Sequence, residues 1–326
     1  MTSTEAITKV EKASNAKKLF GDEPHVRYRE LAKLVHPDVV EAKLRRRAEL
    51  AFRRLGELYA TVNGKAASIS EVVIGKWLVG APIAKGDIAD VYSAEHVKDG
   101  TKGIFKIARD PRDTDLLEEE YFALSLIGKN KTTKPFLKYT PKILDKFEAS
   151  DRRVNVLTPA DGMALRDICE IVELDFRHLV WMANRSLNLL GAIHQEGIIH
   201  GAVVPSHLMF GPVSHSLTLL DWCYAVTGES KKHIPAIVRD YENLYPKEVL
   251  RKKPPTSATD IYMLFASMKS TGAVIPRRFK ALFDWCLAES PKARPQDAWA
   301  LLEKWLDTAE QEYGAPKYLK LDIPVS

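Results

Sequence analysis

Cysteine is scarce in this sequence and follows no pattern. The three cysteines, Cys169, Cys223 and Cys286, are odd in number and far apart, so we expect neither a disulfide framework nor a paired-cysteine metal site. The sequence also lacks an apolar run of the roughly 18 to 20 residues that a membrane span needs. Its N-terminal residues contain no apolar segment typical of a signal peptide. Together these absences favour a cytoplasmic protein with no membrane partner.

What the sequence does contain is enough apolar residues for a packed core. Hydrophobic residues make up 45% of the 326-residue chain, a length that suits one large domain and one small one. The net charge of +5 is concentrated near the N-terminus, where residues 1–64 hold 13 Lys and Arg against 9 Asp and Glu. This excess indicates either a solvated helix face or a surface for an acidic partner. We do not expect that partner to be a nucleic acid.

Apolar periodicity divides the chain into segments of different character. Helical spacing comes first, then short runs of β-branched and aromatic residues punctuated by glycine, and then mainly helical spacing with a short strand pair near residues 207–221. We therefore predict the α+β fold class. The expected segments are a frayed N-terminus (1–12), a small helical module (13–63), a linker (64–73), a strand-rich lobe (74–157), a helix-rich lobe (158–310) and a C-terminal tail (311–326).

Two amphipathic helices form the core of the expected helical module. The segment YRELAKLV (28–35) places apolar residues at the spacing of one helix face, and His36-Pro37 ends that helix because proline restricts the residue before it. AFRRLGELYATV (51–62) continues the pattern in a second helix. A short connection between two such helices makes an antiparallel hairpin, with His36 and Asp38 at its tip.

This module resembles a J-domain, the co-chaperone module that stimulates ATP hydrolysis by DnaK-class chaperones. The resemblance covers residues 13–63 and rests on the HPD tripeptide between two matching helices. It implies that a DnaK-class chaperone is a partner and that these residues contact it: His36, Pro37, Asp38, Arg27, Arg29 and Lys33. The helix before this hairpin, around 14–20, is short and carries little of the family's usual pattern. A plain helical hairpin whose loop reads HPD is the alternative.

The next segments carry groups that phosphoryl transfer needs, namely a phosphate cradle and a lysine with a carboxylate partner. IAKGDIADVYSA (83–94) precedes Lys106 in GIFKIA (103–108), and Glu120 follows in LLEEEYFALSLI (116–127). These segments resemble the glycine-rich loop, strand lysine and helix glutamate of protein kinases. The resemblance implies that Gly86, Val91, Lys106 and Glu120 bind a nucleotide, with Glu119 as the alternative to Glu120. Gly86 is the only glycine of the loop pattern that this chain keeps.

The segment IIHGAVVPSHLMF (198–210) resembles the kinase catalytic loop but lacks most of its polar groups. His200 is kept, Ala202 stands at the position of the catalytic aspartate, and His207 stands at the position of the metal-binding asparagine. An alanine cannot accept or orient a proton, so we assign no catalytic residue to this degenerate loop. His207 is expected to be a packed or solvent-facing histidine, with metal ligation as the alternative.

LLDWCYA (219–225) resembles the kinase D-F-G segment, and Asp221 keeps the carboxylate that would bind a metal ion. The resemblance implies ATP and Mg²⁺ as cofactors, with Asp221 as the Mg²⁺ ligand. Three further residues match structural positions of the family: Glu248, Asp260 and Arg294. The resemblance spans about residues 74–306 and implies a bilobal fold.

The two resemblances lead to one expectation of function and two alternatives. We expect a J-domain protein with an ATP-binding pseudokinase-like domain that recruits or stimulates a DnaK-class chaperone for an unidentified protein client. One alternative is a non-standard active serine/threonine-type protein kinase, because the loss of the base need not abolish turnover through a loose transition state. The other is a co-chaperone whose kinase-like lobe binds only protein partners.

Overall fold

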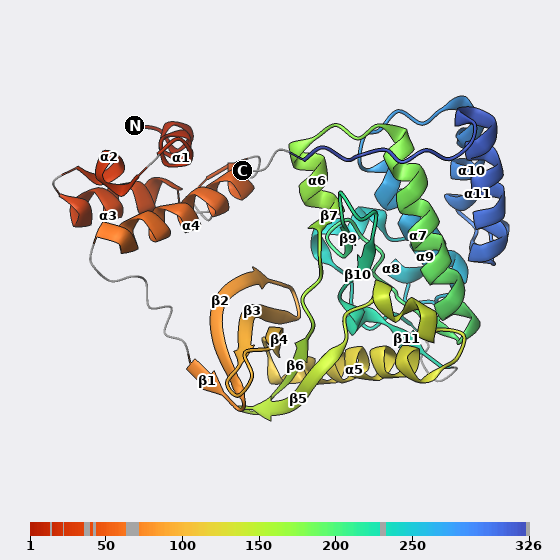
Figure 1. Ribbon diagram of the computed structural model, residues 1–326, viewed down its shortest axis with the longest axis horizontal. Helices are drawn as coiled ribbons and strands as arrows, with labels where there is room; N and C mark the ends of the chain where they lie inside the picture. The colour runs from red at the N-terminus through yellow and green to blue at the C-terminus, as the bar shows by residue number, and fades with distance from the viewer. Residues whose placement is uncertain are drawn as a thin grey trace. The chain divides into compact units, whose positions relative to one another are not determined.

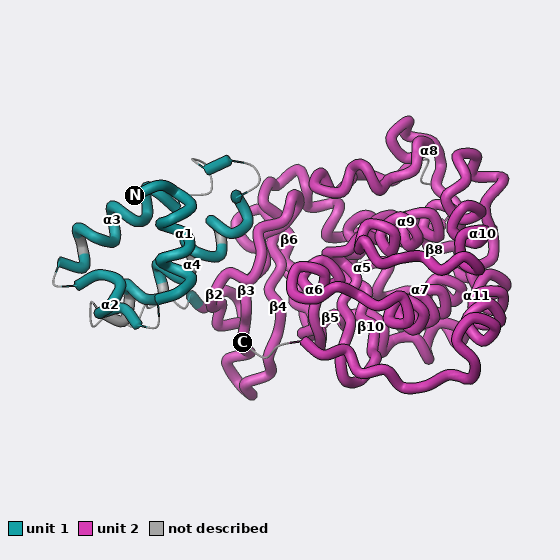
Figure 2. Tube along the Cα trace, turned by 90° about the horizontal axis from the view of Figure 1, so that it is seen from above, with its two compact units in different colours: residues 1–72 teal, residues 73–326 magenta. Residues whose placement is uncertain are grey.

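A computed structural model describes residues 1–13, 15–21, 23–35, 40–41, 44–62, 72–228 and 233–323. The chain forms two compact units, residues 1–72 and residues 73–326 (Figure 2). Nearly all of the expected linker lies outside the described residues.

The described residues of the first unit form four helices (Figure 1). Their apolar faces meet in one cluster, in which Leu31, Val35 and Leu55 are almost fully buried. Phe20, Tyr28 and Tyr59 add an aromatic group to this cluster, with the two tyrosine rings stacked 4.1 Å apart. The periodicity of the two main helices is thus confirmed. The helices are α1 (Ser3–Glu11), α2 (Ala16–Phe20), α3 (Pro24–Val35) and α4 (Arg45–Val62).

Helix α1 corrects the expectation that residues 1–12 are frayed. The Thr2 hydroxyl accepts a hydrogen bond from the Glu5 backbone N–H, and the Glu5 carboxylate accepts one from the Thr2 N–H, which makes a capping box. One face of the helix buries Ala6, Ile7 and Val10 against the rest of the unit. The segment was misjudged because its many polar residues hide a short but regular apolar stripe.

The second unit begins with a curled antiparallel sheet of six strands in the order β1-β2-β3-β4-β6-β5 (Figure 1). Helix α5 (Thr114–Lys129) contacts β4, β5 and β6. Aromatic and β-branched residues form a separate core in this sheet, with Trp77 and Phe105 among the most buried. The strands are β1 (Val72–Ile74), β2 (Trp77–Lys85), β3 (Ala89–His96), β4 (Lys102–Ala108), β5 (Ile143–Ala149) and β6 (Arg152–Leu157).

Helices dominate the rest of the second unit. Phe176, Phe279 and Trp305 pack together at its centre, with ring centroids 4.6 to 6.0 Å apart. The longer helices are α6 (Leu165–Ile171), α7 (Phe176–Gln195), α9 (Ser257–Lys269), α10 (Arg277–Cys286) and α11 (Ala298–Tyr313). Helix α11 therefore extends three residues into the segment that was expected to be a tail.

Two small sheets and several short helical turns complete this part. Strands β9 and β10 pair antiparallel, which confirms the strand pair predicted near residues 207–221. The short elements are β7 (Met163–Ala164), β8 (Ile198–Ile199), β9 (Leu208–Phe210), β10 (Leu217–Leu219), β11 (Val226–Thr227), α8 (Lys247–Leu250) and the 3₁₀ turn η4 (Trp222–Tyr224). A sheet followed by helices is an α+β arrangement, as predicted. Among the described residues, none of the helices has the length and apolar character needed to cross a membrane.

Candidate functional site

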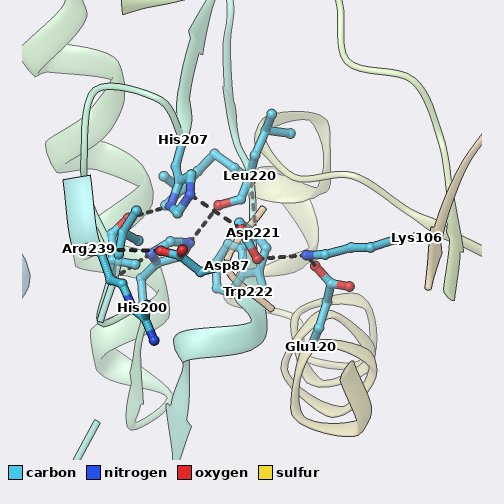
Figure 3. A network of polar contacts seen from close by, with 12 residues as sticks. Asp87, Lys106, Glu120, His200, His207, Leu220, Asp221, Trp222 and Arg239 are labelled. Carbon is cyan, nitrogen blue, oxygen red and sulfur yellow. Dashed lines mark hydrogen bonds and ion pairs between the residues drawn. The ribbon is translucent and has the colours of Figure 1, made fainter. Parts of the chain in front are cut away.

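Three segments meet around the side chain of Lys106: β4, helix α5 and the turn that follows β10 (Figure 3). Lys106 lies on β4, and its ammonium donates to Glu120 Oε1 of α5 at 2.8 Å and to Asp221 Oδ1, just after β10, at 2.6 Å. The side chains of Lys106 and Glu120 are 7% and 0% exposed, whereas that of Asp221 is 27% exposed. The site is therefore buried on the side of the helix and reached by solvent at Asp221.

The electrostatics of this group favour its charged form. Burial acts to lower the pKa of Lys106, but the carboxylates of Asp221 and Glu120 outweigh burial and hold that pKa well above its ordinary value. Burial also acts to raise the pKa of Asp221, yet the Lys106 ammonium keeps it lower than usual. One ammonium between two carboxylates leaves one unbalanced negative charge. The desolvation cost of that charge is reduced because Asp221 is partly exposed to solvent.

Neighbouring residues hold Glu120 rather than Glu119 against the lysine. The Asn155 amide on β6 donates to Glu120 Oε2 at 3.0 Å and to the Leu117 carbonyl at 2.8 Å. The Glu119 carboxylate instead accepts from the Thr227 hydroxyl at 2.7 Å. The choice of Glu120 over Glu119 as the partner of Lys106 is thus confirmed. Asn155 was missed by the sequence reasoning, although a lone amide within the apolar strand VNVL was a usable signal.

The predicted glycine-rich loop is the turn between β2 and β3, and its backbone groups already have partners. The Gly86 N–H donates to the Ala89 carbonyl at 3.0 Å, and the Gly86 carbonyl accepts from Arg109 at 3.0 Å. At the tip, the Asp87 carboxylate accepts from the Arg239 N–H at 3.1 Å. Val91 pairs directly with Lys106 across β3 and β4, so both residues face the same side of the sheet.

The loop that contains His200, Gly201 and Ala202 is held by a buried carboxylate. Asp260 of α9 accepts from the backbone N–H groups of His200 at 2.8 Å and Gly201 at 2.9 Å, and it lies 2.9 Å from His194 Nε2. Ala202 is fully buried and offers no polar side-chain group. Asp260 therefore holds this loop in place, in keeping with its expected structural role, and the loop contains no carboxylate of its own.

The hydrogen bonds of the two histidines in this loop define which ring nitrogens carry protons. His200 Nδ1 accepts from the Ala202 N–H at 3.2 Å, so its Nε2 donates to the Leu220 carbonyl at 3.0 Å. Burial lowers the pKa of His200 to about 4, so its ring is neutral near pH 7. His207 Nδ1 donates to the Ala202 carbonyl at 2.9 Å, which leaves Nε2 at 3.4 Å from Asp221 Oδ2. His207 is buried, not solvent-facing.

The backbone at Asp221 is strained. Its φ of 61° and ψ of 70° lie in the left-handed region, which is uncommon for residues other than glycine and is often found at functional sites. The turn that follows is anchored by Trp222, whose indole N–H donates to the Leu219 carbonyl at 2.9 Å. These contacts point the Asp221 carboxylate at Lys106 and His207 (Figure 3).

Other predicted residues lie outside this site. Glu248 and Arg294 form a buried two-pronged ion pair with distances of 2.5 and 3.2 Å, which is a structural contact. In the first unit, Arg27, Arg29 and Lys33 are exposed on α3, and Arg27 pairs with Glu30 at 2.8 Å. His36, Pro37 and Asp38 are not among the residues that the structure describes.

A cation could be held at two places among the described residues. Glu120, Asp221 and Cys223 present ligand atoms within 4.8 Å of one another, but the Lys106 ammonium already contacts both carboxylates. Asp221 and His207 form the second place, with one carboxylate oxygen and one imidazole nitrogen. Mg²⁺ prefers oxygen ligands, so neither set matches that ion well.

No protein-family model matches this sequence, and no curated protein is detectably similar to it.

Proposed function

We propose that residues 73–326 form a protein-kinase-like, bilobal domain that binds ATP and transfers phosphate poorly or not at all. The observation that carries this proposal is the Lys106 ammonium held between Glu120 and Asp221 at 2.8 and 2.6 Å. A lysine oriented by a helix carboxylate suits the phosphates of a nucleotide, and a neighbouring carboxylate suits their metal ion. The three residues come from separate segments, and Lys106 and Asp221 are 115 positions apart.

The weak transfer that we propose follows from the loop at 200–207. In this loop the buried Ala202 stands where the kinase resemblance places a base. The nearest imidazole is that of His207, and it donates its Nδ1 proton to the Ala202 carbonyl. No described side chain of this loop offers a free carboxylate to orient an attacking hydroxyl group. A non-standard active kinase is the second candidate, since Lys106 is retained and Asp221 is partly open to solvent.

ATP binding is tested by the thermal unfolding of the full chain with and without ATP and a divalent metal ion. We expect a rise in Tm for the wild type, because a ligand that binds only the folded state stabilises it. Lys106→Met should lose that rise. Lys102→Met is the matched control, since Lys102 lies on the same strand with its side chain 71% exposed.

Three outcomes would count against this proposal. Equal Tm shifts in the wild type and Lys106→Met would exclude Lys106 from the nucleotide site. No shift in the wild type would exclude nucleotide binding and would favour a lobe that binds only proteins. Phosphate transfer to a protein substrate that Asp221→Asn abolishes would instead favour the active kinase.

We also propose that residues 1–72 form a J-domain-like module that stimulates a DnaK-class chaperone. The exposed cations Arg27, Arg29 and Lys33 on α3 support an acidic partner surface, because complementary charge steers association. His36→Gln should remove the stimulation of the chaperone's ATPase in a single-turnover assay, whereas His96→Gln in the second unit should leave it intact. Equal stimulation by His36→Gln would show that the assignment is wrong.

A further inference from the structure

Among the described residues of the second unit, three histidines lie close to a carboxylate, and one of these contacts differs from the others. His96 Nδ1 lies 2.9 Å from Asp99 Oδ1, and His194 Nε2 lies 2.9 Å from Asp260 Oδ2. Both are hydrogen-bond distances with a proton between the two atoms. His207 Nε2 lies 3.4 Å from Asp221 Oδ2, which is half an ångström longer.

The proton on His207 is placed by its other contact. Nδ1 lies 2.9 Å from the Ala202 carbonyl oxygen, which can only accept, so Nδ1 carries the proton. In the neutral ring, Nε2 therefore turns a lone pair toward the Asp221 carboxylate. The 3.4 Å separation of Nε2 and Oδ2 exceeds the usual N–H···O range of about 2.7–3.2 Å, which fits an Nε2 atom that carries no proton.

Two electron-pair donors that face each other at 3.4 Å make a site for a cation. Two ligand atoms each about 2.1 Å from one ion, and separated by this distance, subtend roughly 110° at the ion, which is close to the tetrahedral angle. The second oxygen of Asp221 is bound to Lys106, so the carboxylate cannot turn freely away from this arrangement. The partial exposure of Asp221 leaves room for further ligands from water or from phosphate oxygens.

We propose that His207 Nε2 and Asp221 Oδ2 are two ligands of a divalent transition-metal ion, and that they select Mn²⁺ or Zn²⁺ over Mg²⁺. Imidazole nitrogen suits these ions, whereas Mg²⁺ prefers oxygen and gives up its water reluctantly. The inference deepens the proposed nucleotide site by naming the metal that accompanies the nucleotide. His207 thereby becomes the residue that determines the metal specificity.

The test uses the full chain with metal alone and no nucleotide. Mn²⁺ is titrated into the protein at pH 7.5, and the electron paramagnetic resonance signal of free Mn²⁺ reports the bound fraction. We expect binding that Mg²⁺ displaces only in large excess. His207→Asn, which replaces the nitrogen ligand by an amide oxygen, should reduce the preference for Mn²⁺ over Mg²⁺ by about tenfold or more. His96→Asn, at a hydrogen-bonded histidine–carboxylate pair, is the matched control and should leave the preference unchanged.

Pulsed electron paramagnetic resonance on the wild type tests the proposed His207 ligand even if His207→Asn fails to fold. Bound Mn²⁺ should show coupling to an imidazole ¹⁴N nucleus. The proposal is overturned if that coupling is absent, if Mn²⁺ does not bind, or if Mg²⁺ competes equally. Failure of the nucleotide site is separately visible, because it removes the ATP-dependent rise in Tm and leaves the ¹⁴N coupling in place.

Discussion

Gly201 shows how the backbone of the 200–207 loop limits which residue type a single position can hold. Its φ is +76°, and a Cβ atom added there would lie 2.5 Å from the Tyr224 carbonyl oxygen. Its N–H is bound to Asp260 at 2.9 Å, so the backbone cannot easily move away. The local backbone therefore requires a residue without a side chain at this position.

We expect Gly201→Ala to lower the free energy of unfolding of the second unit by about 2–4 kcal/mol, from backbone strain together with the clash at Tyr224. Gly228→Ala is the matched control, because Gly228 has a φ of +72° and no atom within 4 Å of the added Cβ. It should cost only about 1 kcal/mol, from the positive φ alone. Denaturant unfolding followed by tryptophan fluorescence measures both, and equal losses would contradict the clash.

At the scale of elements, α1 shows how tertiary contacts stabilise a helix that is too short to be stable alone. It has nine residues, and isolated helices of this length are marginal in water. Its stability comes from the burial of Ile7 and Val10 and from a two-pronged ion pair between Arg47 of α4 and Glu11. The polar composition of this segment conceals its helical character, because the contacts that stabilise it come from residues 36 positions away.

We expect Ile7→Ala to destabilise the first unit by about 2–4 kcal/mol, because it leaves a cavity between α1 and its neighbours. Far-UV circular dichroism should show an earlier transition for the first unit. Tryptophan fluorescence should not change, because all six tryptophans lie within residues 73–326. Lys9→Ala, at an exposed position of the same helix, serves as the control. A fluorescence transition that moves with Ile7→Ala would show that the units do not unfold independently.

Across the whole molecule, the α+β class and the pairing of Lys106 with Glu120 followed from patterns with a local cause. Apolar periodicity marks helices and strands, and Lys106 and Glu120 lie on adjoining elements only 14 residues apart. Asp221 was assigned to the nucleotide site through a motif that follows a short strand, but its direct contact with Lys106, 115 positions away, was not predicted.

Contacts that depend on the packing of distant segments were not predictable. The Asn155 amide reaches α5 across 35 residues, and Asp87 meets Arg239 across 152 residues. The orientation of the His207 ring depends on a backbone carbonyl, which no sequence motif encodes. One-dimensional patterns carry the spacing of residues but not the direction in which a buried polar group points.

The separation of the three charged residues along the chain also orders their assembly during synthesis. Lys106 and Glu120 leave the ribosome close together and can form a neutral pair as soon as β4 and α5 are made. Asp221 follows Glu120 by about 100 residues, which at 5–20 residues per second is a delay of roughly 5 to 20 s. The nascent sheet and helix can thus pack around a balanced pair. The surplus negative charge arrives only with the segment that keeps its carboxylate partly in water.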